Sequence, residues 1–455
     1  MTQIKLLRRF LIISSKTKGL VIGAPASGCG KTTISVGLTR ALRRNGAEIG
    51  VIKVGPDFID PAFLSVASGT KCQNIDNWAM RNSLISYIFK KTTSNKDFVL
   101  IEGVMGLFDG APNGKGSTAD IASILGLPVL LVIDCKGMGA SIAAVVKGFS
   151  SFRNDISISG VILNRVNSLK HEKILRKSLK TLDIQILGAI PQDNQINLPS
   201  RYLGLIQAHE HKDLEERVER IADLVETYSD LESIKKIASN ISIDKYSNFH
   251  PPPIPPIGQR ISIAYDEAYS FIYHSIIEKW HQAGAEISFF SPLNGESINA
   301  NADAIYLPGG YPELYVGKII ANKRFLRDLK VASTKSNITI YGECGGYLTL
   351  GKFIVDKDGN SHEMAGIFPI EASFYEKKLH LGYREAVICK NNPLGKKGTV
   401  YRGHEFHYAN LKVPKGLKPL FTISDSLSKT LGDSGSMIGN VMGSFIHLMD
   451  IKSHK

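Results

Sequence analysis

The feature that most constrains this fold is the alternation of short, unbroken apolar runs with longer amphipathic segments. In the first half of the chain the apolar runs lie at residues 19–25, 49–56, 97–106, 129–135, 158–166 and 186–192. The segments between them, such as 33–46 and 139–149, carry apolar residues at helical spacing. Strands that are apolar on both faces need helices on both faces. The alternation therefore predicts a parallel sheet in an α/β fold.

A proline-rich stretch, HPPPIPPIGQ at residues 250–259, divides the chain. Proline fixes φ and removes backbone donors, so this stretch predicts a stiff, extended connector. We expect one domain at 17–249 and a second at 260–455. The second half repeats the alternation, with strands expected at 260–268, 284–292, 302–310 and 337–344 and a helix at 271–284.

Composition excludes several classes of protein. The five cysteines are scattered without a C-x-x-C pair, which excludes a disulfide framework and a cysteine zinc site and fits a reducing cytoplasm. No run of about 18 apolar residues predicts a membrane span. The first 17 residues lack the pattern of a signal peptide, and we expect an N-terminal extension there. The net charge of +13 either steers an anionic ligand or reflects solvated lysines. Basic residues do not cluster with aromatics, so nucleic-acid binding is not favoured.

The first apolar run leads into a glycine-rich loop, GAPASGCGKTT at residues 23–33. Gly28 and Gly30 would let backbone N–H groups surround phosphate oxygens, with the positive end of the next helix behind them. Lys31 would reach the outer phosphates, the Thr32 hydroxyl suits Mg²⁺, and Thr33 completes the loop. The loop predicts nucleotide binding. The alternative is a glycine turn used only for packing.

Two positions of this loop depart from common patterns. Pro25 stands where the first glycine of the motif usually lies, and Ala26 stands where partition ATPases carry a second lysine. The absence of that lysine favours an ATP-using enzyme over a filament- or DNA-linked switch.

Two later strand ends carry acidic residues. KVGPDFIDP contains Asp57 and Asp60, and IEGVMGLFDG contains Glu102 and Asp109. A Mg–phosphate site needs hard oxygen ligands, and a carboxylate such as Glu102 is costly to bury unless it is paired or metal-bound. We therefore expect Thr32, Asp57 and Glu102 to bind Mg²⁺. A turn residue or helix cap is the alternative for each acid alone.

In the second half, ITIYGECGGYLTLG places Cys344 between glycines at the end of a strand. The G-x-C-x-G pattern is typical of a nucleophile elbow, where a tight strand-to-helix turn presents a reactive side chain. The N–H of Gly345 would stabilise an oxyanion, and LPGGYPE offers Gly310 as a second donor. The alternative is a buried, inert cysteine.

A cysteine nucleophile commonly uses a histidine base. His447 lies at the end of a short apolar run in GSFIHLMD, and RGHEFHY contributes His404 and His407. Spacing alone does not choose among these three histidines.

Seven ordered segments closely resemble the cobyrinate/hydrogenobyrinate a,c-diamide synthases of cobalamin biosynthesis. They are APASGCGKTT, KVGPDFIDPAF, IEGVMGLFDG, LPGGYPEL, GECGGY, GHEFHYA and GSFIHLMD, and the resemblance covers nearly everything after residue 18. It implies a dethiobiotin-synthetase-like P-loop ATP-binding domain followed by a flavodoxin-like class I glutamine amidotransferase domain of the cobyric-acid type.

The resemblance also implies roles for individual residues. Cys344 would be the glutaminase nucleophile and His447 its base. Asn164, in ILNRV, would read the adenine, and Asp60 and Asp109 would help to activate the substrate carboxylate. Wider relatives have a glutamate two residues after the histidine, where this chain has Met449. The orientation of His447 is thus open, with Asp450 and Glu405 as the candidates.

The reaction implied by the resemblance uses ATP, Mg²⁺ and glutamine. Cys344 would release ammonia from glutamine, and ATP would convert a carboxylate of hydrogenobyrinate or cobyrinate into an acyl phosphate that ammonia attacks. The cobalt-free substrate is favoured by GSFIHLMD and GAEISFFSP. A cobyric acid synthase and an ATP-binding module with an inactive glutaminase half are the alternatives, and a homodimer stays open.

Overall fold

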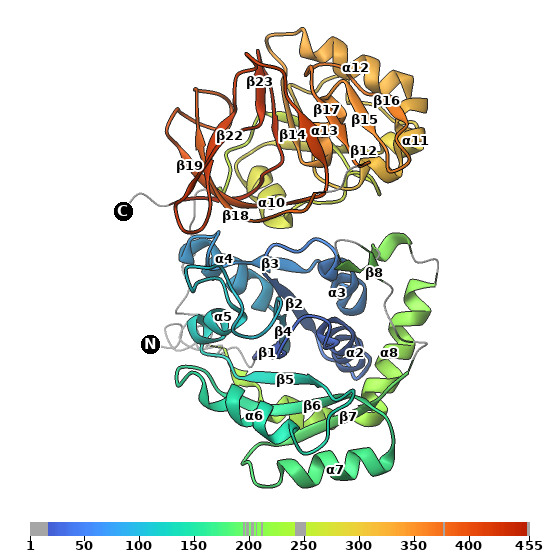
Figure 1. Cartoon of the computed structure of the whole chain (residues 1–455), viewed down its shortest axis with the longest axis vertical. Coiled ribbons are helices and arrows are strands. Elements are labelled where there is room, and N and C mark those ends of the chain that lie inside the picture. Colours follow the sequence, from blue (N-terminus) through green and yellow to red (C-terminus); the bar gives the residue numbers. More distant parts are fainter. Residues whose placement is uncertain are drawn as a thin grey trace, which may run out of the picture. The chain divides into compact units, whose positions relative to one another are not determined.

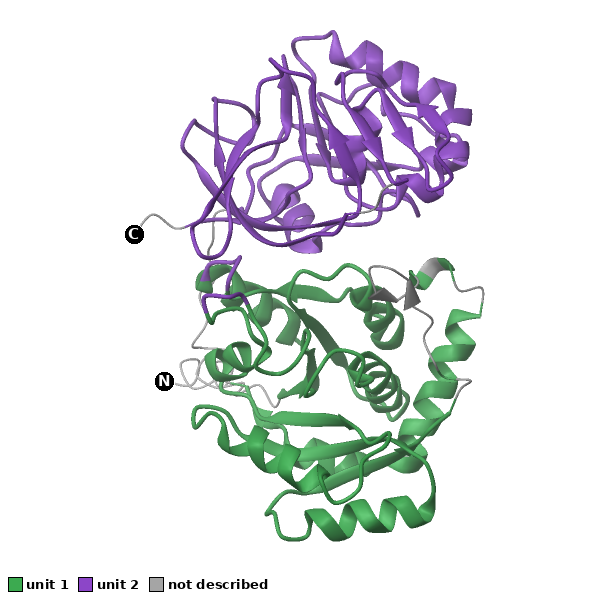
Figure 2. Ribbon diagram, viewed as in Figure 1, with its two compact units in different colours: residues 1–77, 82–110, 114–250 green, residues 78–81, 111–113, 251–455 purple. Residues whose placement is uncertain are grey.

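A computed structural model describes residues 17–193, 196, 200–201, 204–205, 207–210, 213–241, 252–375 and 378–452. Most of the expected N-terminal extension and the start of the proline-rich stretch lie outside the described residues. The chain forms two compact units (Figure 2). Residues 78–81 and 111–113 belong with 251–455 in the second unit, although they precede the proline-rich stretch by more than a hundred residues.

The first unit is built on an eight-stranded sheet in the order β3-β2-β4-β1-β5-β6-β7, with β10 paired to β1 (Figure 1). Every pair along this path is parallel, whereas β10 is antiparallel. The six expected strands are confirmed, and β3 and β10 are additions. The strands are β1 (Lys18–Gly23), β2 (Ile49–Val54), β3 (Gln73–Ile75), β4 (Phe98–Glu102), β5 (Val129–Asp134), β6 (Ile158–Val166), β7 (Ile186–Pro191) and β10 (Ser239–Asn240).

Helices cover both faces of this sheet, which explains why its strands are apolar on both sides. One hydrophobic core joins the sheet to α2 (Lys31–Arg44), α3 (Asp60–Ser68) and α8 (Leu214–Tyr228). On the opposite side in Figure 1 lie α4 (Asn82–Thr93), α5 (Thr118–Leu125) and α6 (Ile142–Ser151). The unit also contains α7 (Leu169–Leu179), α9 (Leu231–Ile237) and the short pair β8 (Ser200–Arg201) and β9 (Gly204–Leu205).

The second unit contains a six-stranded sheet in the order β12-β11-β13-β14-β24-β23. Its first five strands are parallel and follow the 2-1-3-4-5 order of flavodoxin-like folds. The strands are β11 (Arg260–Ala264), β12 (Glu286–Phe290), β13 (Ala304–Leu307), β14 (Thr339–Glu343), β23 (Ser436–Ile438) and β24 (Val441–Ser444). The helices are α10 (His274–Gln282), α11 (Val316–Ala321), α12 (Lys323–Ser333) and α13 (Gly345–Leu350). The four expected strands and the expected helix are confirmed.

Beyond α13 the expected alternation of strands and helices is wrong, because two largely antiparallel sheets follow. One consists of β15 (Phe353–Val355), β16 (Ser361–Glu363), β17 (Glu371–Ser373) and β20 (Asn410–Lys412). The other has the order β22-β21-β18-β19-β25, with β18 (His380–Ile388), β19 (Val400–His407), β21 (Phe421–Ser424), β22 (Thr430–Ser434) and β25 (His447–Ile451). Strands such as β18 are only partly buried, so they lack the unbroken apolar runs of a two-sided sheet.

The described part of the proline-rich stretch packs against the second unit. Ile254 and Ile257 are buried, and Trp280 Nε1 donates to the Ile254 carbonyl at 2.9 Å. At its C-terminal end the connector is therefore fastened to the unit that follows it.

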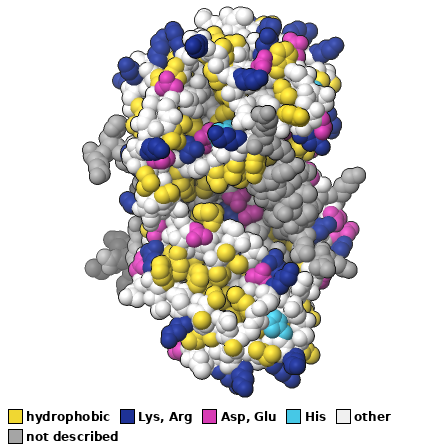
Figure 3. Space-filling view, in the orientation of Figure 1, with side chains coloured by type: hydrophobic (Ala, Val, Ile, Leu, Met, Phe, Trp, Pro, Cys, Tyr) yellow, Lys and Arg dark blue, Asp and Glu magenta, His cyan; other side chains and the backbone are white. Residues whose placement is uncertain are grey.

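Two further properties of the molecule are the apolar character of its helices and the distribution of charge on its surface. No helix in the described ranges combines the length and the apolar character needed to cross a membrane. On the face drawn in Figure 3, Lys and Arg side chains are scattered among other residue types rather than gathered in one patch.

Candidate active site

In the first unit, the glycine-rich loop joins β1 to α2 in the expected manner. Gly30 caps α2 with a φ of 90°, and Gly28 has a φ of 80°. Both values lie in the left-handed region that favours glycine. The loop thus ends at a helix N-terminus whose first backbone N–H groups have no intrahelical acceptor and suit an anion.

Lys31 and Thr32 extend from this helix end to neighbouring strand ends. Lys31 Nζ donates to the carbonyls of Ala26 at 3.3 Å and Met105 at 2.5 Å. Burial and the charge of Lys53 lower the pKa of Lys31. Thr32 Oγ1 lies 2.7 Å from Glu102 Oε1 and 3.1 Å from Asp60 Oδ2. The loop is therefore connected to the two acidic strand ends predicted from the sequence.

Lys53 is the main residue of this site that the sequence reasoning missed. Its Nζ lies 2.5 Å from Asp60 Oδ2, 2.8 Å from Glu102 Oε1 and 3.5 Å from Asp57 Oδ2. Burial alone would lower the pKa of Lys53, but these carboxylates raise it well above its ordinary value. The available signal was a lysine inside the otherwise apolar strand IGVIKV.

The acidic residues around Lys53 differ in burial and in their pKa shifts. Glu102 is fully buried, and burial raises its pKa. Asp57 Oδ1 accepts from the N–H groups of Ile59 at 2.8 Å and Asp60 at 3.2 Å. Burial, followed by the charge of Asp60, raises the pKa of Asp57 to about 7. Asp60, rather than the expected Asp57, shares the Thr32 hydroxyl with Glu102.

The chemistry of this oxygen cluster fits a magnesium ion. Among the described residues, Glu102 Oε2 is buried and has no hydrogen-bond partner. A buried carboxylate oxygen without a donor is costly, and a cation would satisfy it. Carboxylate and hydroxyl oxygens are the ligands that Mg²⁺ takes in nucleotide sites.

A pocket of about 400 Å³ opens beside the phosphate loop, lined by Gly30, Thr33, Lys136, Asn164, Arg165, Pro191, Gln192, Asp193 and Ile196. Asn164 Nδ2 donates to the Cys29 carbonyl of the loop at 2.9 Å. The pocket therefore lies where a nucleoside would extend from phosphates held by the loop. Asp109, by contrast, is exposed, and its Oδ2 accepts from the Gly106 N–H at 2.8 Å.

In the second unit, Cys344 occupies the turn between β14 and α13. It has a φ of 48° and a ψ of −106°, which is a strained conformation for a residue with a Cβ. A strained strand-to-helix turn is the geometry of a nucleophile elbow, as expected from G-x-C-x-G. Gly309 lies between Cys344 and His447. A Cβ added to Gly309 would strike the His447 ring and would lie 3.3 Å from Cys344 Cβ, so the two side chains are close together.

His447 is the histidine that pairs with this cysteine. Burial alone would lower the pKa of His447, but the charge and hydrogen bond of Cys344, together with Glu343, raise it to about 10. At neutral pH the imidazole therefore keeps its proton beside the Cys344 sulfur. A protonated imidazole next to a thiol is the arrangement that can activate a cysteine as a nucleophile.

Glu343, the residue directly before the cysteine, holds His447 from the other side. Its Oε1 lies 3.2 Å from His447 Nδ1. Its Oε2 accepts from Tyr341 Oη at 2.9 Å and from the Leu448 N–H at 3.4 Å. Glu343 is almost fully buried. The sequence reasoning missed it, because it considered only Asp450 and Glu405 as partners of His447.

The two acids expected to orient His447 are engaged elsewhere. Asp450 pairs with Arg81 at 2.7 Å, and Glu405 pairs with Arg384 and His407 at 2.9 Å each. The expectation that Asp450 or Glu405 orients His447 is therefore wrong, and Glu343 contacts His447 instead. Glu343 at the end of β14 is paired with Ser444 at the end of β24, which brings it beside the start of β25.

The two other histidine candidates lie next to this centre. His404 is paired with His447 across β19 and β25, and their rings stack with centroids 4.8 Å apart. His404 Nε2 also bonds Tyr273 Oη at 2.7 Å. His407 bonds Glu405 and stacks on Phe445.

The expected oxyanion donors Gly345 and Gly310 lie side by side. A Cβ on Gly345 would be 3.1 Å from the Gly310 nitrogen and 2.7 Å from Pro312 Cδ. Gly345 is also the first residue of α13, so its N–H has no acceptor within the helix.

Comparison with known proteins places both units in families. Residues 20–206 match a domain described as the CobQ/CobB/MinD/ParA nucleotide binding domain, and residues 260–453 match a CobB/CobQ-like glutamine amidotransferase domain. The chain is 47% identical over 440 residues to the hydrogenobyrinate a,c-diamide synthase of Brucella anthropi. The match covers 96% of this chain and 100% of that protein. The chain belongs to the hydrogenobyrinate a,c-diamide synthase family.

Further members of this family give the same relationship. The Sinorhizobium sp. hydrogenobyrinate a,c-diamide synthase is 45% identical, covering 95% of this chain and 99% of its own length. The Mesorhizobium japonicum hydrogenobyrinate a,c-diamide synthase is 41% identical, covering 94% and 98%. Membership confirms the resemblance found in the sequence motifs and identifies the chain as a glutamine-dependent amidating ligase.

Proposed function

We propose that this chain amidates the a and c side-chain carboxylates of hydrogenobyrinate, with ATP and glutamine as co-substrates. The observation that carries the proposal is that one chain holds both a thiol paired with a charged imidazole and a phosphate loop beside buried carboxylates. The first arrangement suits the release of ammonia from an amide. The second suits the transfer of a phosphoryl group to a carboxylate.

The glutaminase step would take place at Cys344. The thiolate attacks the side-chain amide carbon of glutamine, and the N–H groups of Gly345 and Gly310 stabilise the oxyanion. His447 donates its proton to the departing nitrogen, which leaves as ammonia. Water, deprotonated by His447, then hydrolyses the thioester to glutamate. Glu343 holds the imidazole in position through both proton transfers.

The synthetase step would take place at the phosphate loop. The loop N–H groups and Lys31 hold the ATP phosphates, and the pocket beside Asn164 receives the adenosine. A side-chain carboxylate of the macrocycle attacks the γ-phosphorus and ADP leaves, which gives an acyl phosphate. Ammonia then attacks the acyl carbon, and inorganic phosphate leaves. Two such rounds convert two carboxylates into amides.

The oxygen cluster would hold the magnesium ion that accompanies ATP. Thr32, Glu102 and Asp60 are the proposed ligands, with Asp57 close by. The ion would neutralise charge on the transferring phosphoryl group. Lys53 balances the carboxylates and fixes their positions. Asp109, exposed on its loop, stays a proposed contact for the substrate carboxylate.

Product masses test the proposal. The purified chain is incubated with ATP, Mg²⁺, glutamine and hydrogenobyrinate, and mass spectrometry follows the macrocycle. We expect two successive replacements of OH by NH₂, and a lower rate with cobyrinate. An unchanged macrocycle in the presence of active glutaminase would refute the assignment of substrate.

The Cys344→Ser variant separates the two half-reactions. It should lose glutamine-dependent amidation but retain amidation with ammonium salts, because the synthetase site does not need the thiol. A wild-type chain without thiol-dependent glutamate release would instead support the alternative of an ATP-binding module with an inactive glutaminase half.

A further inference from the structure

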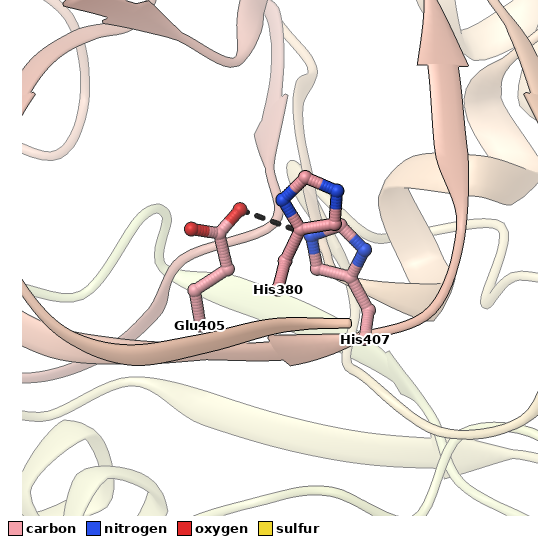
Figure 4. A group of neighbouring side chains, drawn as sticks. All are labelled: His380, Glu405 and His407. Atoms are coloured by element: carbon pink, nitrogen blue, oxygen red, sulfur yellow. Dashed lines mark hydrogen bonds and ion pairs between the residues drawn. The ribbon is translucent and has the colours of Figure 1, made fainter. Parts of the chain in front are cut away.

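A cluster outside both proposed reaction centres brings together His380, Glu405 and His407, here called the His–Glu–His cluster. His380 on β18 is paired directly with His407 on β19, and Glu405 lies two residues before His407. Alternate residues of a strand share one face, so the three side chains project from the same face of the sheet. One ligand-type atom from each lies within 4.8 Å of the others, as Figure 4 illustrates.

The carboxylate of the cluster is held in a fixed orientation. Glu405 Oε1 lies 2.9 Å from His407 Nε2, and Oε2 accepts from Arg384 Nε at 2.9 Å. Arg384 is itself anchored, because it donates to the Tyr383 carbonyl at 3.0 Å. One oxygen is thus tied to the guanidinium while the other faces the histidines. This is the arrangement of a metal-binding carboxylate with an outer partner.

The two imidazoles differ in freedom. His407 is buried and stacked on Phe445, with ring centroids 3.7 Å apart. The His380 ring stacks on the other histidine at 4.7 Å and is only half-buried. Figure 4 shows the two rings overlapping, with the Glu405 carboxylate beside them. One ligand-type atom of each ring and of the carboxylate nonetheless stays within 4.8 Å of the others in this arrangement.

We propose that the His–Glu–His cluster binds one divalent transition-metal ion of the Zn²⁺ type. Two imidazole nitrogens and one carboxylate oxygen suit borderline ions, whereas Mg²⁺ and Ca²⁺ prefer oxygen ligands throughout. Three protein ligands leave a fourth coordination position open to water. The ion would fasten β18 to β19, the strand that also carries His404 next to His447. The site does not depend on the proposed function.

Metal titration of the full-length chain tests this proposal. Chelator-treated protein is titrated with Zn²⁺ by calorimetry and with Co²⁺ by visible absorption. The titrations use the Cys344→Ser background, because the thiolate and His447 could otherwise bind the same ions. With excess Mg²⁺ present to occupy the oxygen cluster of the first unit, we expect one Zn²⁺ or Co²⁺ ion per chain and Co²⁺ bands without a thiolate charge-transfer band.

Substitutions assign the ligands. His380→Ala and His407→Ala should each weaken binding by about tenfold or more, and Arg384→Met by about tenfold through the outer partner. The matched control is His362→Ala, because His362 also pairs with a carboxylate, Asp356, at 2.8 Å but lies outside the cluster. Its binding should equal that of the parent.

The proposal is overturned if binding is not saturable at one ion per chain. It is also overturned if the His380→Ala/His407→Ala double variant, shown by circular dichroism to be folded, binds Zn²⁺ as tightly as the parent. Equal losses in the double variant and in His362→Ala would likewise contradict the assignment.

Discussion

Glu343 Oε1 lies 3.2 Å from Nδ1 of His447, although Glu343 belongs to the strand that ends at the nucleophile. The same segment therefore supplies both the cysteine and the acid that contacts His447. The acid is almost fully buried and receives three further donors, which are Tyr306 Oη, Tyr341 Oη and the Leu448 N–H. A carboxylate so fully satisfied is a rigid support for an imidazole.

Glu343→Gln should reduce the kcat of glutamine hydrolysis by about 100-fold or more. The amide keeps the size of the side chain but removes the charge that stabilises imidazolium. Glutamate release is the measurement, and ammonia-dependent amidation should be preserved. Glu363→Gln, on an exposed strand, is the matched control. A variant with wild-type glutaminase would show that Glu343 only packs.

The pH profile of glutaminase should report the same interaction. The folded pKa of His447, raised from 6.5 to about 10, means that the imidazolium is retained up to about pH 10. We expect the kcat/KM for glutamine to hold until pH approaches this value and then to fall. In Glu343→Gln the basic limb should move to lower pH, because one cause of the raised pKa is removed.

The same shift makes a prediction about stability. A raised folded pKa stabilises the fold fully below about pH 6.5, and this contribution is lost as pH rises through about 10. Cys344→Ser removes the largest cause that raises the pKa, so its Tm should vary less than that of the wild type between pH 6.5 and 10. A Tm difference that is independent of pH would contradict the raised pKa of His447.

Lys53→Met should destabilise the first unit by about 3–5 kcal/mol, because it leaves buried carboxylates without their cation. Mg²⁺ should restore part of the loss, since Glu102 and Asp60 then have another positive partner. Thermal unfolding with and without Mg²⁺ is the measurement. Lys71→Met, at an exposed lysine, serves as the control. Unchanged stability of Lys53→Met would show that the carboxylates do not need this ammonium.

Arg81→Ala should destabilise the second unit, because Asp450 is fully buried and Arg81 contacts both of its oxygens. Loss of one partner of such a pair costs about 3–5 kcal/mol. Burial already raises the pKa of Asp450 and Arg81 opposes this, so the loss should be larger at pH 8 than at pH 5. Tm values at both pH values test this. The double variant Arg81→Met/Asp450→Leu should recover much of the stability, and failure to do so would point to a role beyond charge pairing.

Much of the site could be predicted from sequence because its signals are local. Gly28 and Gly30 adopt positive φ values that favour glycine, so a glycine-rich loop is visible in the sequence. The G-x-C-x-G pattern likewise predicts the strained turn at Cys344. Unbroken apolar runs predicted both parallel sheets, because a strand buried on two faces needs apolar side chains at consecutive positions. The antiparallel strands after α13 were not predicted, because their partly exposed faces produce a mixed pattern.

The sequence by itself determined the α/β plan, the glycine-rich loop between a strand and a helix, and the glycine-flanked turn at Cys344, because each depends on residues adjacent in the chain. Spacing left three histidines open, and the family resemblance singled out His447. Only the tertiary structure decided that Glu343 contacts His447 and that Lys53 balances the acids. These choices depend on strand register and on burial. Both bring together side chains that are far apart in sequence, and neither leaves a local pattern.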